Sequence, residues 1–209
     1  VMLVAVLVVG GTLAYFTDAK SATNTFTVGD VKIKLDESNV NDPSGDRVTS
    51  NEYTGMFPGI QYKKDPVVTN TGKNGAYVRA VVTIENGMNW MGLYNENVWT
   101  APQAEAFMKL ICNKMGDGWS LEDYDYVTNA ERGSTDFVAV LKYDGVLATG
   151  KATTAMFENI MLPANATTND ITTRVAQNGV FHIDVVAQAI QADGFTSWND
   201  AFKAFDAQK

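Results

Sequence analysis

A single histidine limits the metal and acid–base chemistry that this chain could carry out. His182 is the only histidine among 209 residues, and Asp184 follows it two positions later. Side chains two apart on a strand share a face, so this pair could supply at most two convergent metal ligands. Peptidase zinc sites usually take three protein ligands, typically including two histidines, as in H-E-x-x-H. We therefore interpret His182 as a surface or half-buried structural histidine, and we predict no metal site and no cofactor.

The other reactive residues also favour structural roles. The chain has no G-x-S-x-G, P-loop or G-x-G-x-x-G motif, and no spacing points to a serine partner for His182. Its one cysteine, Cys112, cannot form an internal disulfide, and it lies beside the apolar face of a helix expected from Thr100 to about Met115. We interpret this thiol as a small buried hydrophobe. We predict that no residue is catalytic and that the protein is not an enzyme.

Two acidic segments could suggest binding sites, and each has a simpler interpretation. Residues 36–55 carry carboxylates and amides that could bind calcium: Asp36, Glu37, Asn39, Asn41, Asp42 and Asp46. They do not follow the D-x-[DN]-x-[DN]-G spacing of a calcium loop, so we predict a solvated hairpin loop. Residues 119–132 set Glu122, Asp123, Asp125 and Glu131 among Trp and Tyr, which could suggest a sugar site. We interpret them as an acidic surface segment that crosses a sandwich.

The first 14 residues have the pattern of an export signal. VMLVAVLVV is apolar and uncharged, and it matches a signal h-region of about 7–15 residues rather than a membrane span of about 20. Thr12 and Ala14 supply the small residues at −3 and −1, which predicts cleavage before Tyr15. Because an initiator Met and a basic n-region are missing, we expect the sequence to begin inside the signal. An uncleaved anchor that lacks its upstream part is the alternative.

Length and composition indicate one all-β domain after the signal. A single sandwich can run to about 200–250 residues, which accommodates everything that follows position 14. The chain is 45% hydrophobic and 19% charged, which provides a core and argues against extensive disorder. Its formal net charge of −8 repels nucleic acid and anionic lipid. We therefore expect neither as a partner.

Alternating apolar residues predict most of the strands. We expect strands within residues 62–69, 76–84, 136–143, 145–148, 153–162 and 179–191. Pro66 marks an edge or a bulge in the first of these, and Asp144-Gly145 predicts a hairpin. Thr100-x-x-Gln103 and Ser197-x-x-Asp200 have the form of helix caps, so we also predict two short helices.

The strand expected after the signal changes its apolar parity. Phe26 and Val28 share one face, whereas Val31, Ile33 and Leu35 share the other. Because side chains alternate with period two, one strand can change parity only through an inserted residue. We predict a β-bulge at Gly29-Asp30. Two short strands joined by a turn are the alternative.

These residues resemble the start of the TasA/CalY (camelysin) family. The resemblance rests on Gly-Thr-Leu-Ala-Tyr-Phe-Thr-Asp at 11–18 and on Asn-Thr-Phe-Thr-Val-Gly at 24–29. Pro58-Gly59, Lys64 and Asn70-x-Gly72 continue the similarity, and residues 189–195 resemble a terminal strand of clostridial members. Ile60 departs from the acidic residue that is common at its position.

The resemblance implies a secreted protein of Gram-positive bacteria or archaea that is exported with a dedicated signal peptidase. It also implies a jelly-roll β-sandwich whose N-terminal segment inserts as a strand into the next subunit of a biofilm fibre. We accordingly expect a signal at 1–14, an assembly segment at 15–25 and a sandwich with two short helices at 26–209. The expected assembly residues are Tyr15, Phe16, Thr17, Asp18, Phe26 and Val28.

We therefore predict a structural subunit of extracellular biofilm-matrix fibres, located in the matrix or at the cell surface. Its partners would be copies of itself and an accessory fibre-nucleating protein. Two other functions stay open. One is a surface-displayed carbohydrate or adhesion module that uses the Trp and Tyr residues of 89–126, and the other is a camelysin-like metalloprotease. For residues 15–25, a disordered tail is the alternative to an assembly segment.

Overall fold

The computed structural model describes residues 17–21, 24–27, 31–53, 56–89, 108, 112, 114–131, 133–162, 164, 166–167, 169 and 182–208. Residues 17–21 and 24–27 are described through their backbone alone. The predicted signal and its cleavage residues Thr12, Ala14 and Tyr15 lie outside the described residues, as do Phe16 and Val28. None of the described helices is long and apolar enough to cross a membrane.

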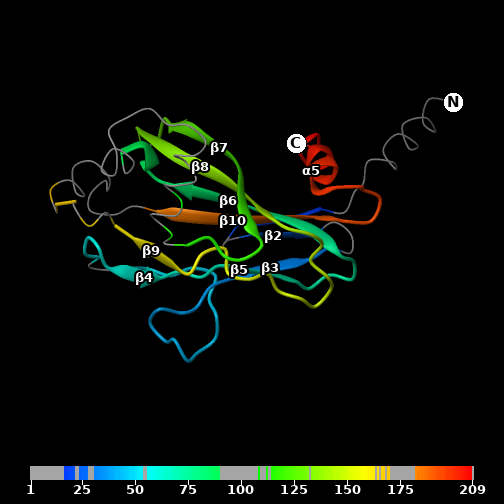
Figure 1. Cartoon of the computed structure of the whole chain (residues 1–209), viewed down its shortest axis with the longest axis horizontal. Coiled ribbons are helices and arrows are strands. Elements are labelled where there is room, and N and C mark those ends of the chain that lie inside the picture. The colour runs from blue at the N-terminus through cyan, green and yellow to red at the C-terminus, as the bar shows by residue number, and fades with distance from the viewer. Residues whose placement is uncertain are drawn as a thin grey trace.

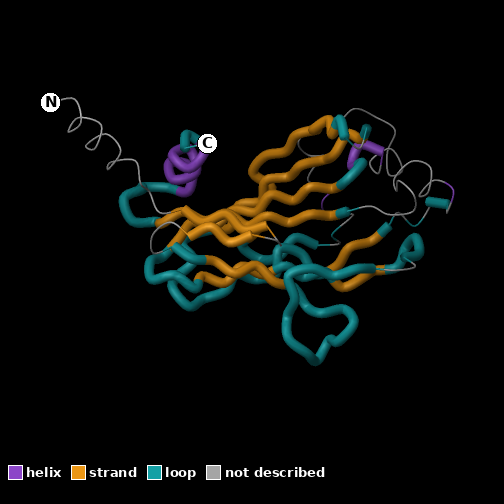
Figure 2. Tube along the Cα trace, turned by 180° about the vertical axis from the view of Figure 1, so that it is seen from behind, coloured by secondary structure: helices purple, strands orange, loops and turns teal. Residues whose placement is uncertain are grey.

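The described strands form one large antiparallel sheet and two small ones that lie in a second layer (Figures 1 and 2). The six-stranded sheet has the order β2-β1-β10-β6-β8-β7. Its strands are β2 (Asn24–Thr27), β1 (Thr17–Ser21), β10 (Ile183–Gln191), β6 (Ala76–Ile84), β8 (Ser134–Tyr143) and β7 (Trp119–Asn129). The small sheets pair β3 (Ile33–Asp36) with β5 (Val67–Asn70), and β4 (Gln61–Lys63) with β9 (Asn159–Met161). The expectation of a mostly β fold is confirmed, and the jelly-roll topology stays a prediction.

The core lies between the two layers and follows the predicted alternation. In β6 the side chains of Ala76, Val78, Ala80, Val82 and Ile84 are all fully buried. Ala187 and Ala189 of β10 and Phe137, Ala139 and Leu141 of β8 are buried in the same cluster. Inward faces of this kind hold a sheet against its neighbouring layer through the removal of apolar area from water.

A helix covers the outer face of the six-stranded sheet at one end, as predicted. The helix α5 (Trp198–Asp206) begins after Ser197, whose hydroxyl accepts a hydrogen bond from the backbone N–H of Asp200. Its buried stripe of Trp198, Ala201, Phe202 and Phe205 packs with Ile190 of β10. The indole N–H of Trp198 donates to the carbonyl of Val78 at 2.9 Å. This small second core joins the end of the chain to β6 and β10.

The structure corrects the prediction of one bulged strand over residues 26–35. Residues 24–27 form β2 in the six-stranded sheet, whereas residues 33–36 form β3 in a small sheet with β5. The apolar parity changes because the two segments belong to different layers. Pro66 was expected to mark an edge or a bulge within one strand. It lies instead between β4 and β5, which also belong to different sheets.

Residues 119–129 are a strand, and the prediction of a segment crossing the sandwich is wrong. This strand, β7, pairs with β8 from Trp119 to Asn129, and its register shifts between Leu121 and Asp123. The shift is a β-bulge, which explains why Trp119 and Leu121 share one sequence parity and Tyr124 and Tyr126 the other.

Three other predicted elements are shorter than expected. The segment 145–148 makes only a single bridge, between Leu147 and Ala76, and does not form a hairpin with β8. In the segment 153–162 only residues 159–161 form a strand. The helix expected to reach Met115 ends before it, because Met115 forms a β-bridge with Phe157. Most of that helix lies outside the described residues.

Candidate assembly site

The first strand lies on the edge of β10 and is the centre of the candidate assembly site. In β1, Thr17 is opposite Ile190, Asp18 opposite Ala189, Ala19 opposite Gln188 and Lys20 opposite Ala187. On its other side β1 pairs with β2, from Asp18 opposite Thr27 to Ser21 opposite Asn24. The expected assembly residues Thr17, Asp18 and Phe26 therefore belong to a two-stranded hairpin. Whether residues 15–25 insert as a strand into a neighbouring subunit stays a prediction.

The edge of β10 that receives β1 is held by elements other than β1. Along its opposite edge, β10 pairs with β6 over nine residues, from Ile183 opposite Ile84 to Gln191 opposite Ala76. Ala187 and Ala189 are fully buried in the main core, and Ile190 is fully buried under α5. The strand is thus fixed from both faces and along one edge. This arrangement holds the edge of β10 in place, so that β1 and β2 can be added to the other four strands of the sheet.

An arginine fixes α5 over this edge. The Nε of Arg79 in β6 donates to Oε1 of Gln188 at 2.6 Å, and its two terminal nitrogens donate to the carboxylate of Asp206 at 2.8 and 2.5 Å. The guanidinium lies 4.4 Å from the centre of the Phe202 ring. A bidentate carboxylate and an aromatic face suit the planar guanidinium. Gln188, the residue opposite Ala19 of β1, is held in place by this contact.

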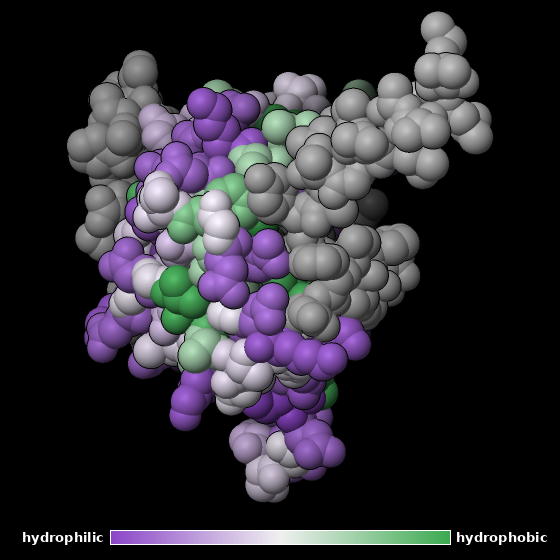
Figure 3. Space-filling view, turned by 90° about the vertical axis from the view of Figure 1, so that its right-hand side faces the viewer, coloured by the Kyte–Doolittle hydropathy of each residue, from purple (hydrophilic) through white to green (hydrophobic). Residues whose placement is uncertain are grey.

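The end of the molecule that carries α5 is shown in Figure 3. Its coloured surface is mostly hydrophilic, and hydrophobic residues appear there as small separate areas. A broad apolar area would be the mark of an interface built from side chains. The coloured part of this face shows no such broad area.

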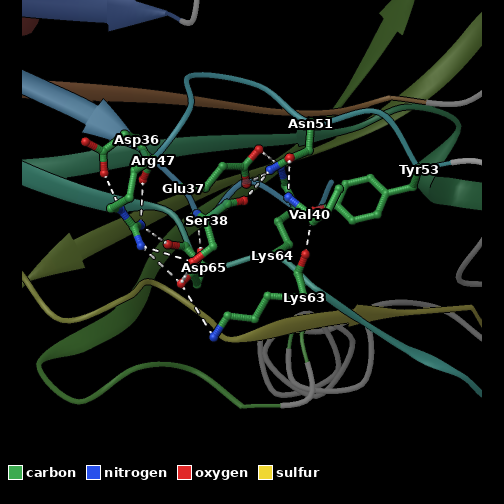
Figure 4. Close-up of polar contacts among 10 residues, drawn as sticks. All are labelled: Asp36, Glu37, Ser38, Val40, Arg47, Asn51, Tyr53, Lys63, Lys64 and Asp65. Carbon is green, nitrogen blue, oxygen red and sulfur yellow. Dashed lines mark hydrogen bonds and ion pairs between the residues drawn. The ribbon is translucent and has the colours of Figure 1, made fainter. Parts of the chain in front are cut away.

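A charged cluster anchors the layer that lies beneath β1 and β10 (Figure 4). The strand β3 packs against β1 and β10, and its last residue, Asp36, begins the cluster. Arg47 has five N–H donors, and it makes five hydrogen bonds, to Oδ1 and the carbonyl of Asp36, to Oδ2 and the carbonyl of Asp65, and to Oγ of Ser38. These bonds tie the loop after β3 to the connection between β4 and β5.

The carboxylate of Asp65 is stabilised in its charged form. Burial opposes its ionisation, but the backbone N–H and hydroxyl of Ser38, at 2.7 and 2.8 Å, and the Arg47 guanidinium outweigh that effect. The pKa of Asp65 is consequently lower than its usual value. The pKa of Arg47 is raised, because its bonds to Asp36 and Asp65 outweigh its partial burial.

A second pair in the same cluster is almost completely buried. The Nζ of Lys64 lies 2.9 Å from Oε2 and 3.2 Å from Oε1 of Glu37, and both residues are less than 10% exposed. Such a pair tolerates burial only because each charge neutralises the other. Asp36 and Glu37 therefore are not part of a solvated loop, which corrects that prediction. Asn41, Asp42 and Asp46 are exposed, as expected.

Cys112 is a buried thiol, as predicted. It is fully buried, and its backbone N–H donates to the carbonyl of Met108 at 2.8 Å, which is the spacing of a helical turn. Burial raises the pKa of this thiol to about 12, and the nearby Lys64 only partly opposes that effect. A neutral thiol of this kind is a poor nucleophile.

His182 pairs with a buried glutamate rather than with Asp184. Its Nδ1 lies 2.6 Å from Oε2 of Glu85, and its backbone N–H donates to the same oxygen at 2.9 Å. The imidazole is 57% exposed, whereas Glu85 is 5% exposed at its side chain. No group of three or more His, Cys, Asp or Glu residues that could hold a metal ion occurs within the described part of the chain. The donors around His182 do not fit a three-ligand zinc site.

The aromatic residues of β7 pack inward. Tyr124 lies 6.0 Å and Tyr126 5.8 Å from the Phe137 ring, measured between ring centroids. Trp119 is buried, and its indole N–H donates to the carbonyl of Thr154 at 3.1 Å. Burial, and secondarily Tyr124, raise the pKa of Tyr126 to about 12. These rings supply core contacts, and the acidic side chains of Glu122, Asp123 and Asp125 are exposed.

The described fold is a mostly β domain in two layers, and the larger sheet has β2 at its edge and β1 between β2 and β10. The family model described as camelysin metallo-endopeptidase matches residues 1–54, which confirms the resemblance to the TasA/CalY (camelysin) family over those residues. No curated protein and no solved structure gives a significant match to the chain.

Proposed function

We propose that this protein is a secreted structural subunit of extracellular fibres, in which each subunit donates its N-terminal residues to the sheet edge of the next. The observation that carries the proposal is the contrast between β1 and β10. The receiving strand β10 is held by β6, the core and α5, whereas β1 adds four paired residues at its free edge. A strand added in this way binds largely through its backbone.

The sequence of β1 supports exchange between molecules. The strand reads Thr-Asp-Ala-Lys-Ser and holds no large apolar residue. Residue types of this kind add little apolar area to a core, so the backbone pairing with β10 is what the segment has to offer. The same strand from another copy would make the same backbone bonds. Donation of this kind is heterologous and extends into a filament.

The secreted location, the dedicated signal peptidase and the matrix role belong to the same proposal, and they rest on the resemblance of residues 11–29 to the TasA/CalY (camelysin) family, with which the family match over residues 1–54 agrees. The name of the matched family describes a metallo-endopeptidase, and for this chain we propose no peptidase activity. A single histidine that is hydrogen-bonded to Glu85 lacks the further ligands of an ordinary peptidase zinc site. Casein cleavage that is lost with chelator and with His182→Ala would contradict this part of the proposal.

The direct test of the fibre function is electron microscopy of the purified protein that begins at Tyr15. We expect unbranched filaments, and mass spectrometry of the secreted protein should find Tyr15 at its N-terminus. A variant that lacks residues 15–24 should give a soluble protein without filaments. Adding a synthetic peptide of residues 15–27 should cap the edge of the variant and leave it monomeric. Filaments of unchanged diameter from the shortened variant would overturn the proposal.

A further inference from the structure

We infer that the unit donated between subunits is the whole β1–β2 hairpin and not β1 alone, an inference that rests on the fibre function proposed above. The order β2-β1-β10 carries the observation. The strand β1 has four register pairs with β10 and four with β2. Within the described strands, β1 is the only partner of β2. Any movement of β1 therefore decides what happens to β2.

Donation of β1 alone would break both of its ladders. The four pairs with β10 and the four pairs with β2 would all have to open before the strand could leave. Each backbone hydrogen bond that is lost opposes the exchange, so opening two ladders is less favourable than opening one. Donation of the hairpin opens only the ladder with β10 and preserves the pairing from Asp18–Thr27 to Ser21–Asn24. Both routes end with the same number of backbone hydrogen bonds. Donation of the hairpin breaks fewer of them on the way, because only the ladder between β1 and β10 opens.

The chain connections favour the same unit. Only two residues separate Ser21 from Asn24, which are paired directly opposite each other. If β1 alone were donated, this connection would have to run between two molecules, and three peptide steps span at most about 10 Å. By contrast, three residues of sequence separate β2, in the six-stranded sheet, from Val31, which is buried in the main core. Short connections of that kind promote exchange of the element they carry.

The hairpin unit also limits how far apart two subunits can be. The donor's Thr27 would lie on the neighbour's sheet, and the donor's Val31 would stay in the donor's own core, where it is fully buried. Four peptide steps between them reach at most about 14 Å. The donated hairpin must therefore lie directly beside the body that donates it. A fibre built in this way has closely packed subunits with little freedom between them.

Paired cysteines in preformed filaments test which unit is exchanged. In a Cys112→Ala background, Asp18→Cys with Ala189→Cys places thiols across the β1–β10 ladder, and Lys20→Cys with Thr25→Cys places them across the β1–β2 ladder. Adjacent antiparallel pairs alternate in spacing, so Lys20→Cys with Ala187→Cys, and Ala19→Cys with Phe26→Cys, serve as the second choice for each ladder. Filaments are oxidised, thiols are counted, and the products are separated by non-reducing denaturing electrophoresis.

Hairpin donation predicts covalent multimers from the 18–189 pair and covalent monomers from the 20–25 pair. Multimers from both pairs would overturn the inference in favour of β1 alone and leave the proposed fibre function intact. Monomers from both pairs would show that no N-terminal residues are exchanged, which overturns the proposed function itself. The reduced proteins, run in parallel, should all migrate as monomers.

Discussion

The two edges of the six-stranded sheet use the same backbone chemistry for opposite purposes. At one edge, β7 pairs with β8 over ten register positions. At the other, the outermost strand β2 pairs with β1, and β1 pairs with β10 over four. The strand β7 also inserts Leu121, Tyr124 and Tyr126 among the residues that pack on the main core. Under the proposed function, side chains more than ladders would decide whether the strands at an edge stay in place or are exchanged.

The two outer strands of the sheet also differ in the charges and bulges that prevent pairing with another molecule. The exposed carboxylates of Glu122, Asp123 and Asp125 lie along β7, and a bulge interrupts the register between Leu121 and Asp123. Charges and bulges of this kind prevent a strand edge from pairing with another molecule. Residues 24–27 of the opposite outer strand, Asn-Thr-Phe-Thr, carry no charge. The proposed fibre would accordingly use the N-terminal side of the sheet and not β7.

The largest expected effect comes from removing one backbone donor of β1. Ala19→Pro deletes an N–H from the middle of the strand and fixes its φ angle, which a paired strand tolerates poorly. We expect complete loss of filaments by electron microscopy and sedimentation, with a folded and soluble protein. Ala19→Ser, which keeps the N–H, is the matched control and should polymerise. Filaments of normal yield from Ala19→Pro would remove β1 from the assembly mechanism.

The layer beneath β1 provides the second prediction. Lys64→Met leaves Glu37 as a buried and unpaired charge, which should lower the free energy of unfolding by about 3–5 kcal/mol. The matched control is Lys63→Met, whose side chain is 54% exposed, so its loss should cost less than about 1 kcal/mol. Urea denaturation measures both variants. Equal effects of the two substitutions would show that the buried pair does not support this layer.

The opposite edge provides the third prediction, which should dissociate stability from assembly. Tyr124→Ala removes a ring that stacks on Phe137, and we expect a loss of roughly 2 kcal/mol in the free energy of unfolding. Filaments should still form below the lowered melting temperature, because β7 is not exchanged. Val127→Ala, at a side chain that is 46% exposed, is the control and should change neither property. A loss of filaments with Tyr124→Ala would contradict the division of roles between the edges.

The smallest expected effect is a decrease in the free energy of unfolding at acidic pH that is due to Asp65. The folded-state pKa of Asp65 is lowered, so its contribution to stability is present above the unfolded-state pKa of about 4. The contribution is lost as the pH falls below that value and through the folded-state pKa. Denaturation at pH 6 and pH 3 should show a smaller decrease for Asp65→Asn than for the unmodified protein. An equal decrease would assign the acid sensitivity to other carboxylates.

Sequence patterns were sufficient where the contacts that shape an element are local or strictly periodic. The strand β6 follows from five alternating apolar residues, and α5 follows from the Ser197–Asp200 cap and an apolar stripe. The strand β7 was missed because its bulge moves the apolar parity from Leu121 to Tyr124. A change of apolar parity wrongly predicted a bulge at Gly29-Asp30. The same criterion would have located the real bulge between Leu121 and Asp123.

The candidate site was predictable only in part. The resemblance of residues 11–29 pointed to the N-terminal segment, and the structure pairs residues 17–20 with β10 and residues 24–27 with β1. The hairpin with β2 was not predicted, because the connection at residues 22–23 carries none of the usual turn residues. The buried pair of Glu37 and Lys64 joins residues 27 positions apart. No local pattern indicates which surface-type residues will meet across such a distance.

The presence of β1 on its own β10 gives the proposed fibre a threshold concentration. A segment tethered to its own receiving edge competes with the same segment of other molecules at an effective concentration on the order of millimolar. Dilute subunits would therefore stay closed, with the edge of β10 already paired to their own β1. Polymer would accumulate only where secreted subunits are confined, or where a nucleating protein presents the first open edge. The closed monomer would thus restrict the start of a fibre to places where subunits are concentrated or nucleated.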